Sequence, residues 1–439
     1  MRGVISLKDS QKGIALIAAY LVIAVLIVFA VTFVNASIGQ NKAASLFKVK
    51  TQAFNLAEAG LDKALDRLRG GSAGNFSGGL SPVGTYSVTI ADLGLYGTMR
   101  RYKVVSVGTT ANLTAQTLVN MLQVDNYARY IWFTDGENYA NTNVWFWNQD
   151  HLDGPTHTND QLNIAGNNPG PVFDGVVESV SDKINYYNNG RNITSSNASN
   201  PPYDTPAFNA GLNLGVDSIN MPMKATYLRS ASALSGGLSL TGNTTIALNS
   251  EGTMNITNTG YYNAHCTGKC NSCCTLTSQP LPSNGALFVD SGNLTISGTL
   301  SGRLTAGSSQ DIIISGNLLY ANDPRLNPSS GDMLGLISES DVVVSGSAPY
   351  NLEIDASVMA LSTSFMLENW WTGSAKGTLT VYGGIIQDQR GPVGTFNGIT
   401  GQKLTGYSKN YKYDSRMLTT PPPFYPTTGD YITLSWEEA

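Results

Sequence analysis

Residues 12–40 read KGIALIAAYLVIAVLIVFAVTFVNASIGQ, and they set the architecture of this protein. Residues 14–34 carry no charge, whereas Lys8, Asp9 and Lys12 lie just ahead of them. As a helix, an apolar run of this length crosses the hydrocarbon core of a bilayer, which is about 30 Å thick. Three kinds of segment fit this description: a cleaved secretory signal, a permanent membrane anchor, and the assembly helix of a filament subunit.

The helical pattern continues beyond the apolar run. Apolar side chains recur every seven residues, at Phe47, Phe54, Leu61 and Leu68. This spacing predicts an apolar seam on a helix whose other faces carry charged side chains. Gly70 and Gly71 are expected to end the helix, which would be roughly 84 Å long from residue 14. We expect its apolar half to need lipid or other apolar helices, and its amphipathic half to lie on a folded domain.

The length of the apolar run bears on the three alternatives. A secretory signal has an apolar region of about 7–15 residues, followed by a cleavage site between small residues. The run here is longer, and the helical pattern does not stop at Ala36, where such a site would fit. These features favour an assembly helix or an anchor, and an ordinary signal remains the third alternative.

Two motifs resemble those of type IV pilins. Residues 1–13 form a short leader that ends in Lys12-Gly13 and is followed at once by the apolar helix. Residues 57–61 read AEAGL, which is similar to PilX-type minor pilins and related pilus-assembly proteins. The resemblance covers about the first 70 residues. It implies that a prepilin peptidase cuts after Gly13, that the mature chain begins at Ile14 with a methylated amine, and that Glu58 belongs to an assembly helix at 14–71.

One position departs from the family pattern. Major pilins usually carry a glutamate at the fifth mature position, which corresponds to Ala18. In that family, the carboxylate is thought to neutralise the terminal amine of a neighbouring subunit. An unpaired charge among apolar helices is costly, and a subunit at the tip has no neighbour above it. The resemblance therefore implies a tip position, as in tip-located minor pilins and the large pseudopilin of type II secretion. A subunit that rarely enters filaments would tolerate the same loss.

Strand-like segments follow the helix at residues 84–90, 101–107 and 115–124. The first two alternate at period two, which is typical of half-buried strands. We expect residues 76–126 to form a small antiparallel meander that covers the amphipathic half of the helix, as in pilins.

Residues 129–439 repeat a short strand motif that ends in Gly. It occurs at 237–242, 293–298, 311–316, 341–346 and 378–383. Repeats of this kind predict the rungs of a parallel β-helix or β-roll, and the imperfect period leaves a β-sandwich as the alternative. Three pairs of side chains should stack inward on successive rungs: Leu294/Ile296, Ile312/Ile314 and Val342/Val344. We expect the last strand, near Trp436, to dock on this domain. The predicted fold class is α+β, with a long helix, a small meander and a large all-β domain.

Composition limits the functions available. Charged residues make up 13 % of the 439 residues and Gly occurs 46 times, which favours a β-rich protein with many turns over a helical enzyme. The net charge is −5 and the chain has no basic stripe, so nucleic acid is not an expected partner.

All four cysteines fall in one short segment, at Cys266, Cys270, Cys273 and Cys274. With His265 beside them they would suit zinc in a cytosolic protein. Outside the cytoplasm thiols oxidise, so the leader favours two disulfides that close a small loop. Adjacent cysteines rarely pair with each other, and the order in which the last two pair with the first two is open.

Aromatic and acidic clusters are candidates for binding or chemistry. Trp370 and Trp371 would form a sugar-stacking platform or a partner anchor, unless they fill the core. Residues 153–160, 162–166 and 173–175 are similar to a segment of large PilX-like proteins, in which we expect a structural corner of the β-domain. His157 with Asp150, Asp153 and Asp160 would suit a metal or acid–base site, but Asx-turns are favoured. No cofactor is expected; calcium would suit such loops, but no twelve-residue EF-type spacing supports it.

Parallel β-helices also include enzymes that cleave polysaccharides with grouped carboxylates and basic partners. Glu353 and Asp355 alternate onto one face of a strand, and Asp311 and Asp341 begin similar strands. Because no Lys or Arg is expected to cluster beside them, we expect no enzymatic activity.

The expected function is a non-enzymatic minor pilin or pilus assembly subunit, at or near the filament tip, that displays an adhesive or capping β-domain. Its expected partners are prepilin peptidase and other pilins, with host or surface glycans as candidate ligands. It would span the inner membrane once before assembly into an extracellular filament. The alternative is a membrane-anchored or secreted β-helix that binds or degrades carbohydrate.

Overall fold

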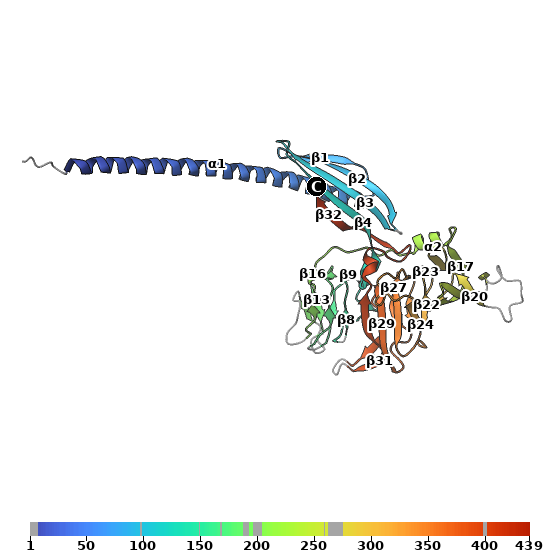
Figure 1. The fold of residues 1–439 in the computed structure, drawn as a ribbon. Helices are drawn as coiled ribbons and strands as arrows, with labels where there is room; N and C mark the ends of the chain where they lie inside the picture. The colour runs from blue at the N-terminus through green and yellow to red at the C-terminus, as the bar shows by residue number, and fades with distance from the viewer. Residues whose placement is uncertain are drawn as a thin grey trace, which may run out of the picture. The chain divides into compact units, whose positions relative to one another are not determined.

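The structure is a computed structural model that describes residues 8–96, 99–148, 150–166, 169–187, 193–195, 204–258, 260–261, 275–397 and 402–439. The chain forms two compact units (Figure 1). The helix unit contains Met1–Gly94, Arg101–Gln123 and Tyr431–Ala439. The β-helix unit contains Leu95–Arg100 and Val124–Asp430.

Helix α1 (Lys8–Arg69) is uninterrupted and begins ahead of residue 14, where the mature helix was expected to start (Figure 1). It ends at the predicted glycine pair. The Gly71 N–H donates to Leu68 O at 2.9 Å, and the Ser72 N–H donates to Arg67 O at 2.8 Å. Gly71 has a φ of 76°, which glycine adopts without strain. The two bonds form a Schellman motif that satisfies the last carbonyls of the helix.

A five-stranded sheet belongs to the same unit, in the order β1-β2-β3-β4-β32. Its first four strands are β1 (Phe76–Leu80), β2 (Gly84–Tyr96), β3 (Met99–Thr110) and β4 (Ala115–Asn126). The pairs β1–β2 and β3–β4 are antiparallel, so the meander expected over residues 76–126 is present.

The fifth strand corrects the expected extent of the β-domain. β32 (Thr427–Glu438) lies beside β4 and does not dock on the β-domain. The Asn120 and Thr433 side chains hydrogen bond at 3.4 Å, and the rings of Tyr102 and Tyr431 lie 5.9 Å apart. The β-helix unit is therefore inserted between two adjacent strands of the sheet. The sequence did not indicate this, because the alternation of a strand does not specify its partner.

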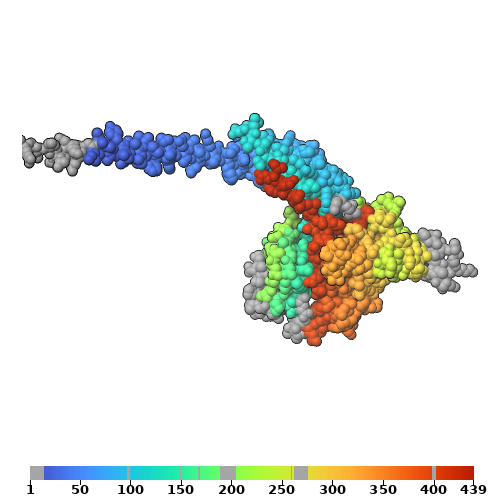
Figure 2. Space-filling model, viewed as in Figure 1, coloured from blue at the N-terminus to red at the C-terminus, as the bar shows by residue number. Residues whose placement is uncertain are grey.

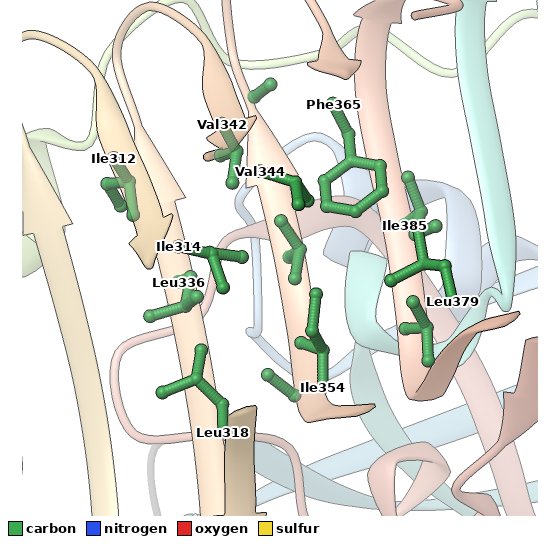
Figure 3. Packing of buried hydrophobic residues seen from close by; sticks show 14 of the residues in the cluster. Ile312, Ile314, Leu318, Leu336, Val342, Val344, Ile354, Phe365, Leu379 and Ile385 are labelled. Atoms are coloured by element: carbon green, nitrogen blue, oxygen red, sulfur yellow. The ribbon is translucent and has the colours of Figure 1, made fainter. Parts of the chain in front are cut away.

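The β-helix unit is built mainly from parallel strands, as expected. Successive rungs include β22 (Leu294–Leu300), β24 (Ile312–Tyr320), β26 (Val342–Val344) and β28 (Phe365–Leu367). Leu294, Ile312, Val342 and Phe365 are partners from rung to rung, and Ile296, Ile314, Val344 and Leu367 repeat the relation two residues on. All eight side chains are buried, and Figure 3 shows several of them packed together. The predicted inward stacking is confirmed, and this aligned apolar column forms the core.

The order of the rungs in space differs from their order in the sequence. β5 (Trp132–Gly136), the first strand of the unit's core, lies between β29 (Ala375–Gln389) and β9 (Thr156–Thr158), parallel to both. From β5 the chain builds rungs outward to β15 (Ala207–Phe208) and β16 (Leu212–Leu214).

The chain then resumes at the opposite end of the stack. β17 (Leu238–Thr241) and β18 (Thr244–Asn249) pair with the strands that follow them, and the rungs return to β29 and β31 (Lys403–Tyr413). In Figure 1 the green strands and the yellow strands accordingly lie on either side of β29. The β-helix is therefore entered near its middle.

The remaining elements of this unit complete the rungs and their turns. They are β6 (Asn138–Tyr139), β7 (Thr142–Asn143), β8 (His151–Leu152), β10 (Asn163–Ile164), β11 (Val172–Phe173), β12 (Val177–Ser179), β13 (Ile184–Tyr186), β14 (Ile193–Ser195), β19 (Thr253–Thr257), β20 (Thr275–Pro280), β21 (Ala286–Asp290), β23 (Arg303–Ser308), β25 (Met333–Ser338), β27 (Leu352–Ala360), β30 (Gly394–Phe396), helix α2 (Thr226–Ser232) and the short helices η1 (Tyr127–Arg129) and η2 (Ser415–Leu418).

Candidate functional site

The apolar half of α1 is the first candidate site. The helix is long and apolar enough to cross a membrane, and no described segment of its own unit buries its most apolar stretch (Figure 2). The side chains of Ile14 and Phe33 are 65 % and 77 % exposed, and Ala18 is exposed as well. Gly13, which precedes the expected cleavage point, lies within the helix. Exposed apolar surface of this extent needs lipid or other apolar helices around it.

The other half of α1 packs on strand β3 through small residues. A Cβ placed on Gly60 would lie 2.2 Å from Ser106 Oγ, and one placed on Gly108 would lie 2.1 Å from the carbonyl oxygen of Ala53. Ala53 and Ala57 are fully buried. The absence of larger side chains lets the helix approach the strand closely. Ala57 and Gly60 of the AEAGL segment therefore belong to the contact face between helix and sheet.

The predicted seam is only partly the buried face. Leu68 is buried and Leu61 is partly buried, but Phe47 is 73 % exposed. Phe54 is half-buried, with its ring 6.1 Å from that of Trp436. The buried face instead follows spacings of three and four residues: Ala53, Leu56, Ala57, Gly60, Ala64 and Leu68.

The extent of the sheet explains the exposure of Phe47. Residues 38–48 are exposed on every face of α1, so Phe47 lies beyond the part of the helix that the sheet covers. Glu58, the other residue predicted for the assembly helix, is exposed.

A cavity in the β-helix unit is the second candidate site, here called the aromatic pocket. Its volume is about 540 Å³, and small-molecule sites span roughly 300–1,000 Å³. Six aromatic residues line it: Tyr139, Trp145, Trp147, Tyr187, Trp370 and Phe396. They come from the β6–β7 hairpin and the chain after it, from the turns that follow β13 and β28, and from β30. The topology of the β-helix brings these distant segments to one place.

The Trp370-Trp371 pair is divided between two environments. Trp370 lines the aromatic pocket, and its ring lies 6.2 Å from that of Tyr139 at an angle of 90°. Its carbonyl oxygen accepts a hydrogen bond from Thr405 Oγ1 at 2.6 Å. Trp371 is 58 % exposed and does not line the pocket. Only the first of the two predicted contact residues therefore belongs to this cavity.

Four charged residues form a buried ion cluster beside the pocket. Arg390 is 1 % exposed and pairs with Glu137 at 2.8 Å. Lys409, which lines the pocket, pairs with Asp150 at 2.7 Å. Arg390 lies 3.9 Å from Asp150, so the two pairs join into one cluster with two positive and two negative groups. Burial lowers the pKa of Lys409, and the adjacent Asp150 carboxylate opposes that change.

The ion cluster also holds the aromatic loop. Arg390 Nη2 donates to the backbone carbonyl of Trp145 at 3.1 Å, and the backbone N–H of Trp147 donates to Asp150 Oδ2 at 3.0 Å. The Arg390 guanidinium lies 3.6 Å from the centroid of Phe146, which fixes the ring between the two tryptophans. Sequence reasoning missed Arg390 and Glu137, because 253 residues separate them and no local motif marks either one.

His157 does not form one site with the three aspartates. It is buried, with Nε2 3.0 Å from Asn159 Oδ1 and Nδ1 3.3 Å from Glu178 Oε2. Its ring stacks on Phe133 at 5.2 Å. The hydrogen bond with His157 lowers the pKa of Glu178. Both ring nitrogens are therefore occupied by neighbours on the same and the next rung.

The aspartates have separate partners. Asp150 belongs to the ion cluster, Asp153 accepts the Tyr413 N–H at 2.5 Å, and Asp160 accepts the Glu137 N–H at 2.9 Å. Within the described ranges, no three His, Cys, Asp or Glu side chains are grouped so that they could hold a metal ion.

Asp311 and Asp341 belong to a ladder that runs between rungs. Asn243 Oδ1 accepts the N–H of Asn293 at 2.9 Å, and Asn293 Oδ1 accepts that of Asp311 at 3.2 Å. Asp311 Oδ1 in turn accepts the N–H of Asp341 at 3.3 Å. These side chains stabilise the same turn on successive rungs, as short polar side chains commonly do in turns.

Glu353 and Asp355 lie on one face, but the expectation that no basic side chain would lie near them was wrong. Arg325 pairs with Glu353 at 2.8 Å and with Asp355 at 3.5 Å. Asp355 also accepts the Tyr320 N–H at 3.1 Å. Burial raises the pKa of Asp355 to about 7, although these contacts oppose the effect. Sequence reasoning missed Arg325 because it lies in the loop between β24 and β25, whereas Glu353 and Asp355 lie on β27.

The four cysteines lie outside the described residues. The disulfide and zinc alternatives for Cys266, Cys270, Cys273 and Cys274 therefore stay predictions.

A family model described as "Domain of unknown function (DUF4900)" matches residues 93–181. The matched segment runs from the end of β2 through β3 and β4 to just beyond β12, and includes Trp145 and Trp147 of the aromatic pocket. It therefore covers parts of both units. Searches of curated proteins and of solved structures find no match.

Proposed function

We propose that this protein is a pilin-like, non-enzymatic assembly subunit of a type IV pilus or a related secretion filament. The observation that carries the proposal is the division of α1 within its own unit. The apolar half is exposed along its length, whereas the following half is packed on a five-stranded sheet. Such a helix has one part available for assembly with other helices and one part that holds a folded head.

In this proposal a prepilin peptidase cuts after Gly13, and the helix from Ile14 waits in the inner membrane. On assembly the helix leaves lipid and enters a bundle of similar helices. Its apolar surface then exchanges one apolar environment for another and is never transferred to water. The close contact at Gly60 and Gly108 keeps the sheet fixed to the helix during this step.

The proposal places the subunit at or near the filament tip, with the β-helix unit displayed as an adhesin or cap. Ala18 supports this position, because the missing carboxylate removes the group that would neutralise the amine of a neighbouring subunit. Other pilins are the proposed partners in the bundle. The β-helix unit is inserted between β4 and β32, so two covalent connections join it to the sheet. Two connections suit a displayed domain that bears tension when the filament is pulled.

Filament fractions test the proposal. Cells of the native host are sheared, and the protein is followed in the released filaments and in the membrane. The expected result is processed protein in both fractions, with Gly13→Leu confined to the membrane as precursor. Gly74→Ala is the matched control, because it lies outside α1 and a Cβ at this position meets no atom within 4 Å. Wild-type protein that is never found in the filament fraction would contradict the proposal.

A further inference from the structure

We propose that the aromatic pocket binds a neutral saccharide, with a sugar ring lying against its tryptophans. The ligand would be that of the β-helix unit, and only the role of such binding in adhesion rests on the proposed function.

The lining suits a ring with an apolar face. Six of the lining residues are aromatic, and they enclose about 540 Å³. The rings of Tyr139 and Trp370 meet at 90° and those of Trp145 and Tyr187 at 76°, so neither pair closes into a face-to-face stack. Aromatic rings in this arrangement can accept the C–H face of a sugar, while its hydroxyl groups point to polar neighbours.

Polar groups for those hydroxyls are present. The indole N–H groups of Trp147 and Trp370 are buried and have no acceptor among the described residues. Thr142, Asn143 and Thr395 also contribute to the lining. A buried donor without an acceptor costs free energy, and the hydroxyl oxygens of a bound sugar could supply the missing acceptors.

The charge balance argues for a neutral ligand. An aromatic cage can also hold a quaternary ammonium group, but such a site is not expected to carry a cation in its wall. Among the described residues that line the pocket, Lys409 is the one with a cationic side chain, and none carries a carboxylate. An anion is not favoured either, because Lys409 is already paired with Asp150 at 2.7 Å.

The pocket is organised before any ligand arrives. Arg390 and Asp150 hold the backbone of Trp145 and Trp147, and Thr405 holds that of Trp370. Backbone segments held in this way have less freedom to lose on binding, which favours affinity for a small ligand.

The test uses the full chain, purified in a polyoxyethylene detergent because glycosidic detergents would compete for the pocket. Soluble tetramers of β-1,4-glucose, α-1,4-glucose and β-1,4-N-acetylglucosamine are titrated separately, and binding is followed by tryptophan fluorescence and calorimetry. Choline and a sulfated oligosaccharide are titrated in parallel. We expect at least one neutral tetramer to bind with a Kd of about 1 mM or tighter.

Variants locate the binding. Trp145→Ala and Trp370→Ala should each weaken it at least about tenfold, whereas Trp436→Ala, in the helix unit, should leave it unchanged. Circular dichroism and thermal unfolding confirm that each variant is folded. The inference is overturned if no neutral tetramer binds, if only choline or the sulfated sugar binds, or if the pocket variants bind as the wild type does. N-terminal processing is measured separately, so a failure here leaves the proposed function standing, and the reverse also holds.

Discussion

Gly108 of β3 lies directly against the backbone of α1 at Ala53: a Cβ on Gly108 would stand 2.1 Å from the Ala53 carbonyl oxygen and 2.4 Å from the amide nitrogen of Ala57. The helix can approach the sheet this closely only because the strand has no side chain at this position. Backbone atoms cannot move aside as the end of a flexible side chain can. The contact therefore makes Gly108 a requirement for the packing of the helix unit.

Gly108→Ala should destabilise the helix unit by about 1–3 kcal/mol, the usual cost of overpacking. Hydrogen exchange of the amides in β3 and β4 measures the effect. Gly39→Ala is the control, because it adds the same methyl group to α1 where nothing lies within 4 Å. Equal protection of the sheet amides in the two variants would show that the close contact does not form.

Ile314→Ala should cost about 2–5 kcal/mol, because it leaves a cavity in the column of buried side chains between Ile296 and Val344. Ile313→Ala removes the same atoms from the opposite face of β24, where the side chain is only partly buried, and should cost clearly less. Denaturant unfolding of the full chain compares them. If Ile313→Ala is the more damaging variant, the register of the β-helix is wrong.

Arg390→Met should destabilise the β-helix unit by about 3–5 kcal/mol, because it leaves the Glu137 carboxylate buried without its partner. Removing both charges in Glu137→Leu/Arg390→Met should recover part of the loss. Thermal unfolding of the wild type, both single variants and the double variant forms a complete cycle. Strictly additive losses would mean that the two residues do not interact.

Asp355 should make stability depend on pH. Its pKa rises from 3.8 to about 7 because the carboxyl is buried, so the folded protein holds a proton that the unfolded chain releases. Raising the pH from about 4 to about 7 should therefore lower stability, by about 1–4 kcal/mol from this group. Asp355→Asn should flatten the profile of unfolding free energy over that window. Parallel profiles for wild type and variant would remove Asp355 as the cause.

Ala18→Glu should change where the subunit lies in a filament. A carboxylate at this position could neutralise the amine of a neighbour, so the variant should become able to enter the shaft. Immunogold labelling of released filaments should find the wild type at filament ends and the variant along their length. Wild-type label spread along the shaft would contradict the tip position.

The sequence predicted those parts of the fold that depend on local pattern. The glycine pair at the end of α1 and the inward stacking of Ile312 and Val342 both follow from local residue types. The exposure of Phe47 was missed because the sequence does not show how far along α1 the sheet reaches, and residues 38–48 are exposed on every face of the helix.

Long-range relations could not be predicted in this way. The placement of β5 between β9 and β29, and of β32 beside β4, depends on which strands find each other in the folded chain. The aromatic pocket has the same origin: Trp370 was a candidate by itself, but Trp145 and Trp147, which line the same pocket, lie more than 200 residues before it, and 253 residues separate Arg390 from Glu137. No local pattern encodes such a meeting.

If α1 is the assembly helix of a processed filament subunit, the protein in its native host has lost residues 1–13. The most direct test is the intact mass and N-terminal sequence of the protein purified from that host. We expect a chain that begins at Ile14, with a methylated amine. A chain that still begins at Met1 would make α1 a simple anchor, and one that begins near Ser37 would make it an ordinary signal; either result would contradict the proposed function.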